Sequence, residues 1–382
     1  MRLLDRYVLK NFLVPFFYCF LGFIAIWLVF ELNDDGRDFL EAKVPIAKVL
    51  SFYVTQLPQI VVISLPVGIM LALLFSLSRM SRSNEIISML TAGVSIPRLL
   101  LPLFIVGLLA SGLNTALNYA LSPRSEGTRK TLLDEMMQRK SKKESLGGQL
   151  FKNRADGRIW YAQNVSLKDN ELRGAHIIQE RPEGGFAVKY YARKANYDPA
   201  TGKWRLRGGM LARYDERGSI TEREDWLDGD REIEGWSETP YRIASAAFDP
   251  QTLGVPELKE YLRLNADLPA TSLASYRTHL AHRWAVPWQC FIAVIIAAPL
   301  GIVNTRRGVL AGVASSIFIF FGVIFLEKLF LALGKGARIP PDVAAWGPNA
   351  VFFLLGVYLL YLRSNNREGL GFLNFLKRKT IR

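Results

Sequence analysis

The sequence has few of the side chains that bind metal ions or form disulfides. Its 382 residues include two cysteines and three histidines. Cys19 and Cys290 both fall within long apolar runs, so they predict small buried side chains rather than a disulfide framework. His279 and His282 are close together with no third ligand nearby, and His176 stands alone in a predicted strand. We therefore expect no metal site.

The short motifs of catalytic chemistry are missing as well. The sequence contains no G-x-x-x-x-G-K-[ST] phosphate loop and no G-x-S-x-G nucleophile turn. Its apolar runs hold no pair of carboxylates of the kind that an intramembrane protease needs. These absences argue against an enzyme with its own nucleotide site, and we expect the chain to bind no cofactor.

Acidic residues are scarcer than basic ones. The chain has 34 Asp and Glu against 48 Lys and Arg, which gives a formal net charge of +14 at pH 7. The basic residues gather at the borders of apolar runs, a distribution typical of membrane topology and of anionic lipid headgroups. We therefore expect no nucleic-acid partner.

Hydrophobic residues make up 50% of the chain, and they occur in blocks rather than with the periodicity of a soluble fold. Six blocks are each about long enough to cross a hydrocarbon layer of ~30 Å. The predicted spans are residues 12–30, 57–77, 99–121, 284–303, 309–333 and 346–362. No small-x-small cleavage site follows Phe30, so we interpret the first span as a retained anchor rather than a signal peptide.

The positions of Lys and Arg predict the orientation, because cytoplasmic loops carry an excess of both. With the N-terminus in the cytoplasm, the cytoplasmic segments hold Arg2, Arg6, Lys10, Arg79, Arg82, Arg98, Arg306, Arg307, Arg363, Arg367, Lys377, Arg378, Lys379 and Arg382. The acidic residues in the same segments are Asp5, Glu85 and Glu368. We predict that both termini are cytoplasmic and that the polar insert between the third and fourth spans lies outside.

That insert contains short stretches in which apolar and polar residues alternate, such as "GRIWYAQNVSL", "ELRGAHIIQE" and "GFAVKYYARKANYD". Gly, Asn and Asp separate them, a pattern typical of an antiparallel sandwich or roll. The interior of such a roll is either a plain core or a slot for lipid, with Ile177 and Val188 as candidate inward-facing residues. The fold class is a polytopic α-helical membrane protein with six transmembrane helices (3+3) and an inserted β-jellyroll-like domain. The predicted domains are 1–121, 122–282 with flanking helices, and 283–382 with a basic tail.

A short polar segment, "SRSNEIISMLTAG", separates the second span from the third. The spacing of its apolar residues predicts an amphipathic helix over 81–93, with Ser83 or Asn84 as the N-cap. Such a helix suits the groove of a cytoplasmic motor protein. The alternative is a helix that lies flat on the lipid surface. The candidate coupling residues are Arg82, Glu85, Ile86, Met89, Leu90 and Gly93.

Charged residues near the outer ends of the first and fifth spans form a second group of candidates. Charges at such depth usually face a bundle interior, a cavity or a partner. The alternative for Lys328 is snorkelling, with Glu327 near the interface. The candidate substrate contacts are Glu31, Arg37, Lys43, Glu327 and Lys328. We expect the two carboxylates to pair with the three cations when no substrate is bound.

Four stretches of the sequence resemble the LptF/LptG (YjgP/YjgQ) permeases of the lipopolysaccharide-export ABC transporter. They are "LLDRYVLKNF", "SRSNEIISMLTAGVSIPRLLLP", "APLGIVNTRRG" and "GKGARIPPDVAAWGPNAVFF". The first of them is closer to G-type members and the third to F-type members. The family's coupling glutamate, in the pattern S-x-E-[IL], falls on Glu85. G-type members tend to carry a lysine near the outer end of span one, where this sequence has Glu31.

The resemblance implies a multi-pass protein of the bacterial inner membrane with a periplasmic β-jellyroll domain. It implies a heterodimer with a paralogous permease, and a cytoplasmic ABC ATPase dimer that uses ATP. Lipopolysaccharide would be drawn from the inner membrane and passed to a periplasmic bridge protein for export to the outer membrane. The alternatives are a secondary transporter, for which interrupted helices would be expected, and a membrane-anchored assembly protein with a periplasmic docking domain.

Overall fold

The structure, a computed structural model, describes residues 3–136, 146–302 and 306–364. The chain divides into two compact units. One, here called the helical unit, comprises Met1–Arg129, Gly254–Pro256 and Ala274–Arg382. The other, the β unit, comprises Lys130–Leu253 and Glu257–Leu273. The domain limits 122 and 282 expected from the sequence remain a prediction.

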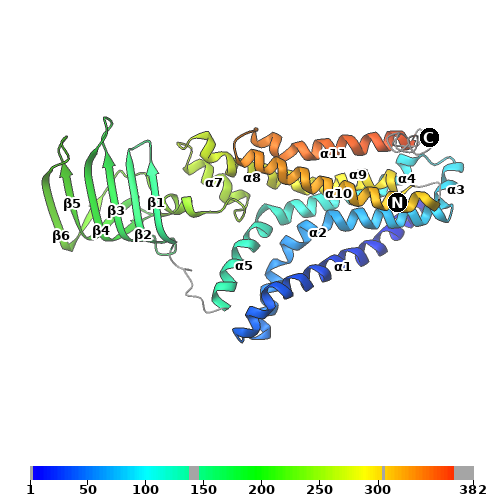
Figure 1. The fold of residues 1–382 in the computed structure, drawn as a ribbon, viewed down its shortest axis with the longest axis horizontal. Coiled ribbons are helices and arrows are strands. Elements are labelled where there is room, and N and C mark those ends of the chain that lie inside the picture. The colour runs from blue at the N-terminus through cyan, green and yellow to red at the C-terminus, as the bar shows by residue number, and fades with distance from the viewer. Residues whose placement is uncertain (1–2, 137–145, 303–305, 365–382) are drawn as a thin grey trace, which may run out of the picture. The chain divides into compact units, whose positions relative to one another are not determined.

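Long apolar helices build the helical unit (Figure 1). They are α1 (Leu3–Glu41), α2 (Ile46–Arg82), α4 (Ile96–Ala116), α8 (Ala270–Ala285), α9 (Gln289–Gly301), α10 (Arg306–Lys335) and α11 (Pro341–Ser364), with the short α3 (Glu85–Thr91) between α2 and α4. The π-helical turn η1 (Leu117–Leu121) carries α4 on into α5 (Ser122–Met136), and the 3-10 turn η3 (Val286–Trp288) carries α8 on into α9.

The expected spans coincide with these helices. Within the described residues, five helical stretches are long and apolar enough to cross a membrane: Leu3–Glu41, Ile46–Arg82, Ile96–Arg129, Ala270–Gly301 and Pro341–Ser364. The remaining expected span, 309–333, falls within α10. Several of these helices contain an internal proline, which membrane helices in general tolerate because neighbouring groups can satisfy the freed carbonyls.

Two features hold the helical unit together: small residues let the helices approach closely, and buried amide side chains form hydrogen bonds between helices. A Cβ atom on Gly301 would lie 2.8 Å from the Cβ atom of Leu77, and one on Gly356 would lie 2.6 Å from Ile295. The Asn114 side chain is fully buried and donates to the Val62 carbonyl over 3.1 Å. Small residues and interhelical hydrogen bonds are the usual means of helix association where water supplies no driving force.

The β unit contains one antiparallel sheet whose strands pair in sequence order. The strands are β1 (Leu146–Asn153), β2 (Arg158–Ser166), β3 (Glu171–Glu180), β4 (Phe186–Asp198), β5 (Lys203–Tyr214) and β6 (Ile220–Ile233). The expected inserted β domain is therefore present. The described strands form a single antiparallel up-and-down sheet, as Figure 1 shows.

One face of this sheet is buried and the other faces solvent. Trp160 and Trp204 are fully buried, with ring centroids 4.8 Å apart, and the returning chain at Ile243 packs on the same face. Ile177 is also fully buried, as expected, whereas Val188 is half-buried. The segment after β6 forms two short helical turns, α6 (Pro240–Ala244) and η2 (Ser245–Ala247), and Ile243 and Ala244 of α6 belong to the core on this face. Ile177 thus belongs to the core of the β unit.

On the solvent-facing side of the sheet, charged side chains of β5 and β6 pair across the two strands. Exposed ion pairs join the strands at Arg205–Glu232 (2.8 Å), Arg207–Asp230 (3.1 Å) and Arg213–Glu222 (3.1 Å). Each exposed pair contributes little stability, about 0–1 kcal/mol. Their more evident effect is to place charge along the edge strand β6, which discourages pairing with another chain.

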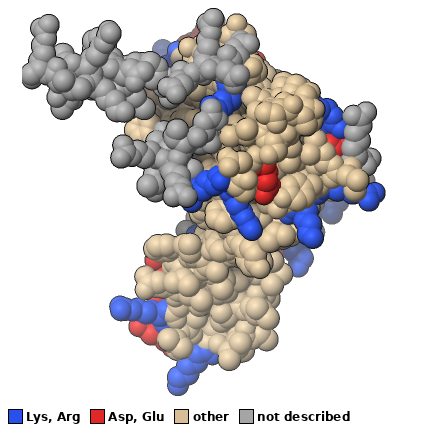
Figure 2. Space-filling view, turned by 90° about the vertical axis from the view of Figure 1, so that its right-hand side faces the viewer, with Lys and Arg blue, Asp and Glu red and all other residues tan. Residues whose placement is uncertain are grey.

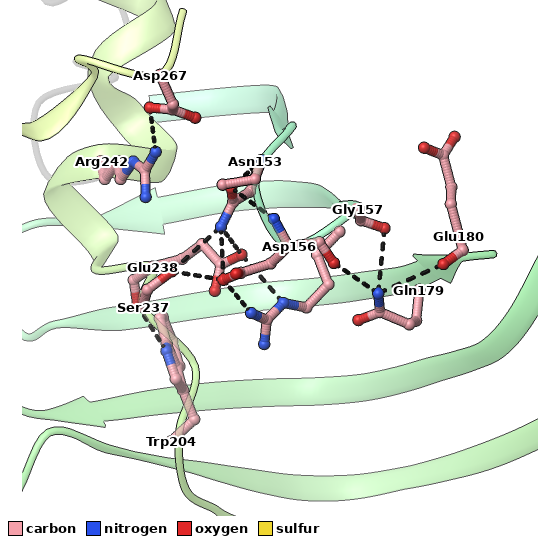
Figure 3. A network of polar contacts seen from close by, with 12 residues as sticks. Asn153, Asp156, Gly157, Gln179, Glu180, Trp204, Ser237, Glu238, Arg242 and Asp267 are labelled. Carbon is pink, nitrogen blue, oxygen red and sulfur yellow. Dashed lines mark hydrogen bonds and ion pairs between the residues drawn. The ribbon is translucent and has the colours of Figure 1, made fainter. Parts of the chain in front are cut away.

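A buried carboxylate ties the returning chain to the first hairpin of the sheet (Figure 3). Glu238 is fully buried, and its Oε1 atom lies 2.8 Å from the Asn153 amide nitrogen and 3.2 Å from Arg158 Nε. Its backbone carbonyl accepts a hydrogen bond from the Trp204 indole over 2.8 Å. Removing one partner of a buried pair costs about 3–5 kcal/mol, so this cluster fixes where the chain leaves the sheet.

Asp156 extends the cluster towards the surface (Figure 3). It pairs with Arg158 and accepts a hydrogen bond from the Ser237 hydroxyl over 2.7 Å. The Ser237 hydrogen bond, and then the charge of Arg158, hold the pKa of the Asp156 carboxyl below its ordinary value. Arg242, on α6, makes a separate ion pair with Asp267 at 2.5 Å. The cluster is structural, because its polar groups are directed at one another.

Candidate functional site

The segment between α2 and α4 forms a shorter helix than the sequence predicts. The expected helix covered 81–93, but α2 continues to Arg82 and α3 spans only Glu85–Thr91. The break arises at Asn84, whose φ of 58° is left-handed. Gly93 ends the helix as expected: its φ is 87°, and its amide bonds the Leu90 carbonyl in a Schellman motif. Asn84, one of the two expected N-caps, precedes the helix, so the expected cap is confirmed and only the outer bounds 81–93 were too wide.

The apolar face of α3 is turned towards the chain's own bundle. Ile86 is 1% exposed and belongs to the main core of the helical unit, and Met89 and Leu90 pack partly against the same core. This corrects the assignment of Ile86 to a docking face, because a residue so deeply buried is not accessible to a partner. The exposed side of α3 presents Ile87, which is 43% exposed, with Ser88, Thr91 and, just before the helix, Arg82.

Glu85 is bound within the chain rather than left free. Its carboxylate accepts hydrogen bonds from the Tyr7 hydroxyl over 2.9 Å and from the Ser83 hydroxyl over 2.8 Å. Nearby, Arg98 at the start of α4 pairs with Asp5 of α1 at 3.0 Å. The first turns of α1 are therefore tied to α3 and to α4. Sequence reasoning missed Tyr7, because a tyrosine at the start of an apolar run carries no signal of its distant partner.

Basic side chains are frequent on the face of the molecule that carries α3. Figure 2 shows this face, with Lys and Arg in blue distributed around it and fewer Asp and Glu in red. Such a surface suits a cytoplasmic membrane boundary, where positive residues are retained and anionic headgroups lie nearby.

A second polar group lies at the opposite end of α1. Glu31 pairs with Arg129 of α5 at 2.7 Å, and Asp35 pairs with the same guanidinium at 3.2 Å. This corrects the expectation that Glu31 pairs with Arg37 or Lys43. Both of those cations are exposed, beyond Glu31 towards the turn between α1 and α2. Arg129 was missed because it follows the third span in a polar segment with many other charges.

A small cavity adjoins the Glu31–Arg129 pair. Its volume is about 110 Å³. Its lining residues are Trp27, Glu31, Gln56, Gln59, Ile60, Ile63, Ser64 and Arg129. Gln56 is 2% exposed, and its amide nitrogen has no hydrogen-bond partner among the described residues. The cavity therefore offers a cation and an unused donor in a space that holds a few water molecules, at ~30 Å³ each, or one phosphate-sized group.

The charges of α10 are also placed differently from expectation. Glu327 does not pair with Lys328, which is exposed; it lies 3.0 Å from His282 Nε2 and accepts a hydrogen bond from Gln289 over 2.7 Å. These contacts join α10 to α8 and α9. The described residues contain no group of three or more His, Cys, Asp and Glu side chains that could hold a metal ion. His176 lies between the rings of Tyr161 and Tyr191.

Helices long and apolar enough to cross a membrane, with a β domain inserted between two groups of them, define a multi-pass membrane protein with one large domain outside the hydrocarbon layer. Residues 6–362 match the model of the family described as "Lipopolysaccharide export system permease LptF/LptG", and the chain belongs to this family. The resemblance found in the sequence is thereby confirmed. The protein is a permease subunit for lipopolysaccharide export, a transport protein of the inner membrane rather than an enzyme.

Two relatives are similar over nearly their whole length. The lipopolysaccharide export system permease protein LptG of Escherichia coli K12 is 24% identical over 375 residues, which cover 94% of this chain and 98% of the relative. The LptG protein of Escherichia coli O6:H1, strain CFT073, gives the same identity and coverage.

Proposed function

We propose that this chain is the G-type permease of an ABC transporter that extracts lipopolysaccharide from the inner membrane and passes it to a periplasmic bridge protein. Its partners are a paralogous permease and a cytoplasmic ABC ATPase dimer that uses ATP, while this chain binds no cofactor. Both termini and α3 are cytoplasmic, and the β unit is periplasmic. The two LptG relatives support the G-type assignment.

The observation that carries the proposal is the way α1 joins the two polar sites. Tyr7 contacts Glu85 at one end of α1, and Glu31 contacts Arg129 at the other. These ends lie roughly 36 Å apart at a rise of 1.5 Å per residue. A displacement of α3 by a motor protein is therefore transmitted by α1 to the cavity beside Arg129. Rigid movement of packed elements is a common mode of such coupling.

The exposed side of α3 is the docking face in this proposal. Ile87 provides the apolar contact, and Ser88 and Thr91 lie beside it. Arg82 and Glu85 flank the turn that precedes the helix. A helix of this length fits a groove on the ATPase through one apolar anchor and a few polar contacts at its rim.

The cavity beside Arg129 is the substrate-facing site. Lipopolysaccharide carries phosphates, which form strong charge-assisted hydrogen bonds with guanidinium groups. A phosphate that enters the cavity competes with Glu31 and Asp35 for Arg129, and Arg37, Lys43 and Lys328 supply further positive charge. Arg129 thus provides a cation close to the place where the family pattern has a lysine in span one.

Photo-crosslinking at neighbouring positions tests the docking face. A photoreactive residue at Ile87 should form an adduct with the ATPase in the purified complex, and the same residue at the buried Ile86 should not. The two positions differ only in which side of α3 they occupy. An intact complex with no ATPase adduct at Ile87 or Ser88 would refute the proposed coupling role of α3.

A loading assay tests the substrate site. The complex carrying Arg129→Gln should retain less lipopolysaccharide after purification than the wild-type complex. Lys48→Gln is the matched control, because Lys48 is an exposed cation at the same end of α2 and does not line the cavity. Equal loading in both variants would exclude the cavity from the transport path.

A further inference from the structure

A larger hollow lies between α1 and α2 at the end that carries α3, and the proposed function does not use it. Its volume is about 490 Å³. Lys10 and Arg79 line it as cations, and the apolar part of its wall includes Val14, Pro15 and Phe75. Such a combination of one charged end and an apolar wall matches an amphiphile with a negative headgroup.

The depth of the hollow matches one leaflet of a membrane. Lys10 and Glu31 lie about 31 Å apart along α1 at a rise of 1.5 Å per residue, close to the thickness of a hydrocarbon layer. Arg79 and Gln56 lie about 34 Å apart along α2 by the same estimate. The two cations are therefore at the headgroup level opposite the Glu31 cavity. The lining residues on α1 extend from Lys10 to Cys19. This distance is roughly 14 Å along the helix, which is about half the thickness of the hydrocarbon layer.

The two cations are available to a ligand. The ion pairs described in the helical unit join Arg98 to Asp5, Arg129 to Glu31 and Asp35, and His282 to Glu327; none of them uses Lys10 or Arg79. Both side chains are exposed, and so is Phe75 beside them, at 57%. An apolar ring exposed next to two cations is favourable where an acyl chain covers the ring and a phosphate meets the charges.

We propose that this hollow binds one anionic glycerophospholipid of the leaflet at the end of the bundle that carries α3. Its phosphate lies between Lys10 and Arg79, and an acyl chain lies along Val14, Pro15 and Phe75. This leaflet is the cytoplasmic one if the orientation in the proposed function holds; the lipid site itself does not depend on that orientation. The bound lipid is a resident of the permease and not its cargo, because the hollow is at the membrane boundary opposite the cavity beside Arg129.

The position of the lipid gives it a structural role. Lys10 lies one helical turn after Tyr7, which bonds Glu85, and Arg79 lies one turn before the end of α2. A phosphate that bridges the two cations therefore joins α1 to α2 just below the α3 contact. Each basic residue near an anionic membrane surface strengthens lipid binding about fivefold, so loss of both Lys10 and Arg79 should weaken lipid binding ~20-fold or more.

Native mass spectrometry of the complete permease complex tests the site. The complex is released from nanodiscs made of phosphatidylglycerol and phosphatidylcholine, and retained lipid is counted. We expect one phosphatidylglycerol retained per copy of this chain, and a ~20-fold loss of retention in the double variant Lys10→Gln, Arg79→Gln. Arg6→Gln is the matched control, an exposed cation one turn before Lys10 that does not line the hollow.

A second variant separates a built site from general surface attraction. Val14→Trp fills the apolar wall and keeps both cations, so it should also abolish retention. Retention unchanged by Val14→Trp, or equal retention of phosphatidylcholine, would reduce the effect to surface charge and overturn the proposal. Retention of added lipopolysaccharide in place of phosphatidylglycerol would overturn the identity of the ligand. The assay uses no ATP and no transport, so its failure is distinct from failure of the Ile87 crosslink.

Discussion

The helices α1 and α2 are nearly equal in length and both are strongly apolar, yet they are held in opposite ways. In the most apolar window of each, 6% of α1 and 72% of α2 is buried within the chain. The buried residues of α1 are Asp5, Val8, Phe12 and Phe39, whereas those of α2 run along most of its length. The chain thus encloses α2 on most sides, whereas α1 packs on the core with one side, for example at Phe16 and Phe20, and leaves its other side exposed.

This difference has a mechanical consequence. A helix packed along its length moves only with the core around it, because packed interiors resist continuous deformation. A helix packed on one side only, with polar contacts at Tyr7–Glu85 and Glu31–Arg129, has fewer contacts to break when it shifts. The exposed apolar side of α1 also needs cover, which lipid and a paralogous permease supply in the proposed assembly. We therefore expect α1 to shift more readily than α2.

The largest effect should come from a cavity in α2. Leu73 is fully buried in the main core, so Leu73→Ala should destabilise the helical unit by about 3–4 kcal/mol. Leu21→Ala on α1 is the control: Leu21 is 59% exposed, and its truncation should cost less than about 0.5 kcal/mol. Thermal unfolding in a defined detergent measures both. Similar losses in the two variants would mean that α1 is as firmly packed as α2.

The next effect concerns the contact between α3 and its surroundings. Glu85→Lys replaces the acceptor of two hydrogen bonds with a cation. Because Glu85 is partly exposed, we expect a loss of about 2–3 kcal/mol in ATPase association, at the low end for a truncated polar pair. The variant should still insert and fold, as tested by its yield and melting temperature. Wild-type ATPase binding and lipid transfer would make α3 a simple connector.

The comparison also shows what the sequence predicts well. The spans and the strands follow directly from local composition, because an apolar block or an alternating run reports its own environment. Ile86 was misplaced because helical spacing identifies an apolar stripe without showing which surface covers it. The pairing order of the strands was not predicted for a related reason: alternation identifies strands but not their partners. Arg129 and Tyr7 act through residues far away in the chain, and no local pattern announces such pairs.

A smaller effect should follow from releasing the outer end of α1. Arg129→Gln removes the cation that pairs with Glu31 and Asp35 and leaves two carboxylates close together. Since the guanidinium is 28% exposed, screening limits the expected loss of stability to about 1–2 kcal/mol. Hydrogen exchange should become faster in the last turns of α1 and remain unchanged in α2. Faster exchange in both helices would show that they move as one body.

The smallest effect should come from the inner end of α1. Tyr7→Phe removes one hydrogen bond, over 2.9 Å, from a partly exposed carboxylate that keeps its bond from Ser83. We therefore expect a loss of only about 0.5–1 kcal/mol in folding stability. The transfer rate of lipopolysaccharide should fall by more than this loss suggests, because the bond is the link between α3 and α1.

A double-mutant cycle of Tyr7→Phe with Glu85→Gln isolates that link. If the hydroxyl acts through Glu85, the second substitution should add little to the effect of the first on transfer rate. Tyr358→Phe provides the control, because Tyr358 is an exposed tyrosine on α11, far along the chain from α3. Additive losses in the cycle would assign the effect of Tyr7 to some other contact. α1 would then receive its movement through its packing on α2, and the expectation that α1 shifts more readily than α2 would fail.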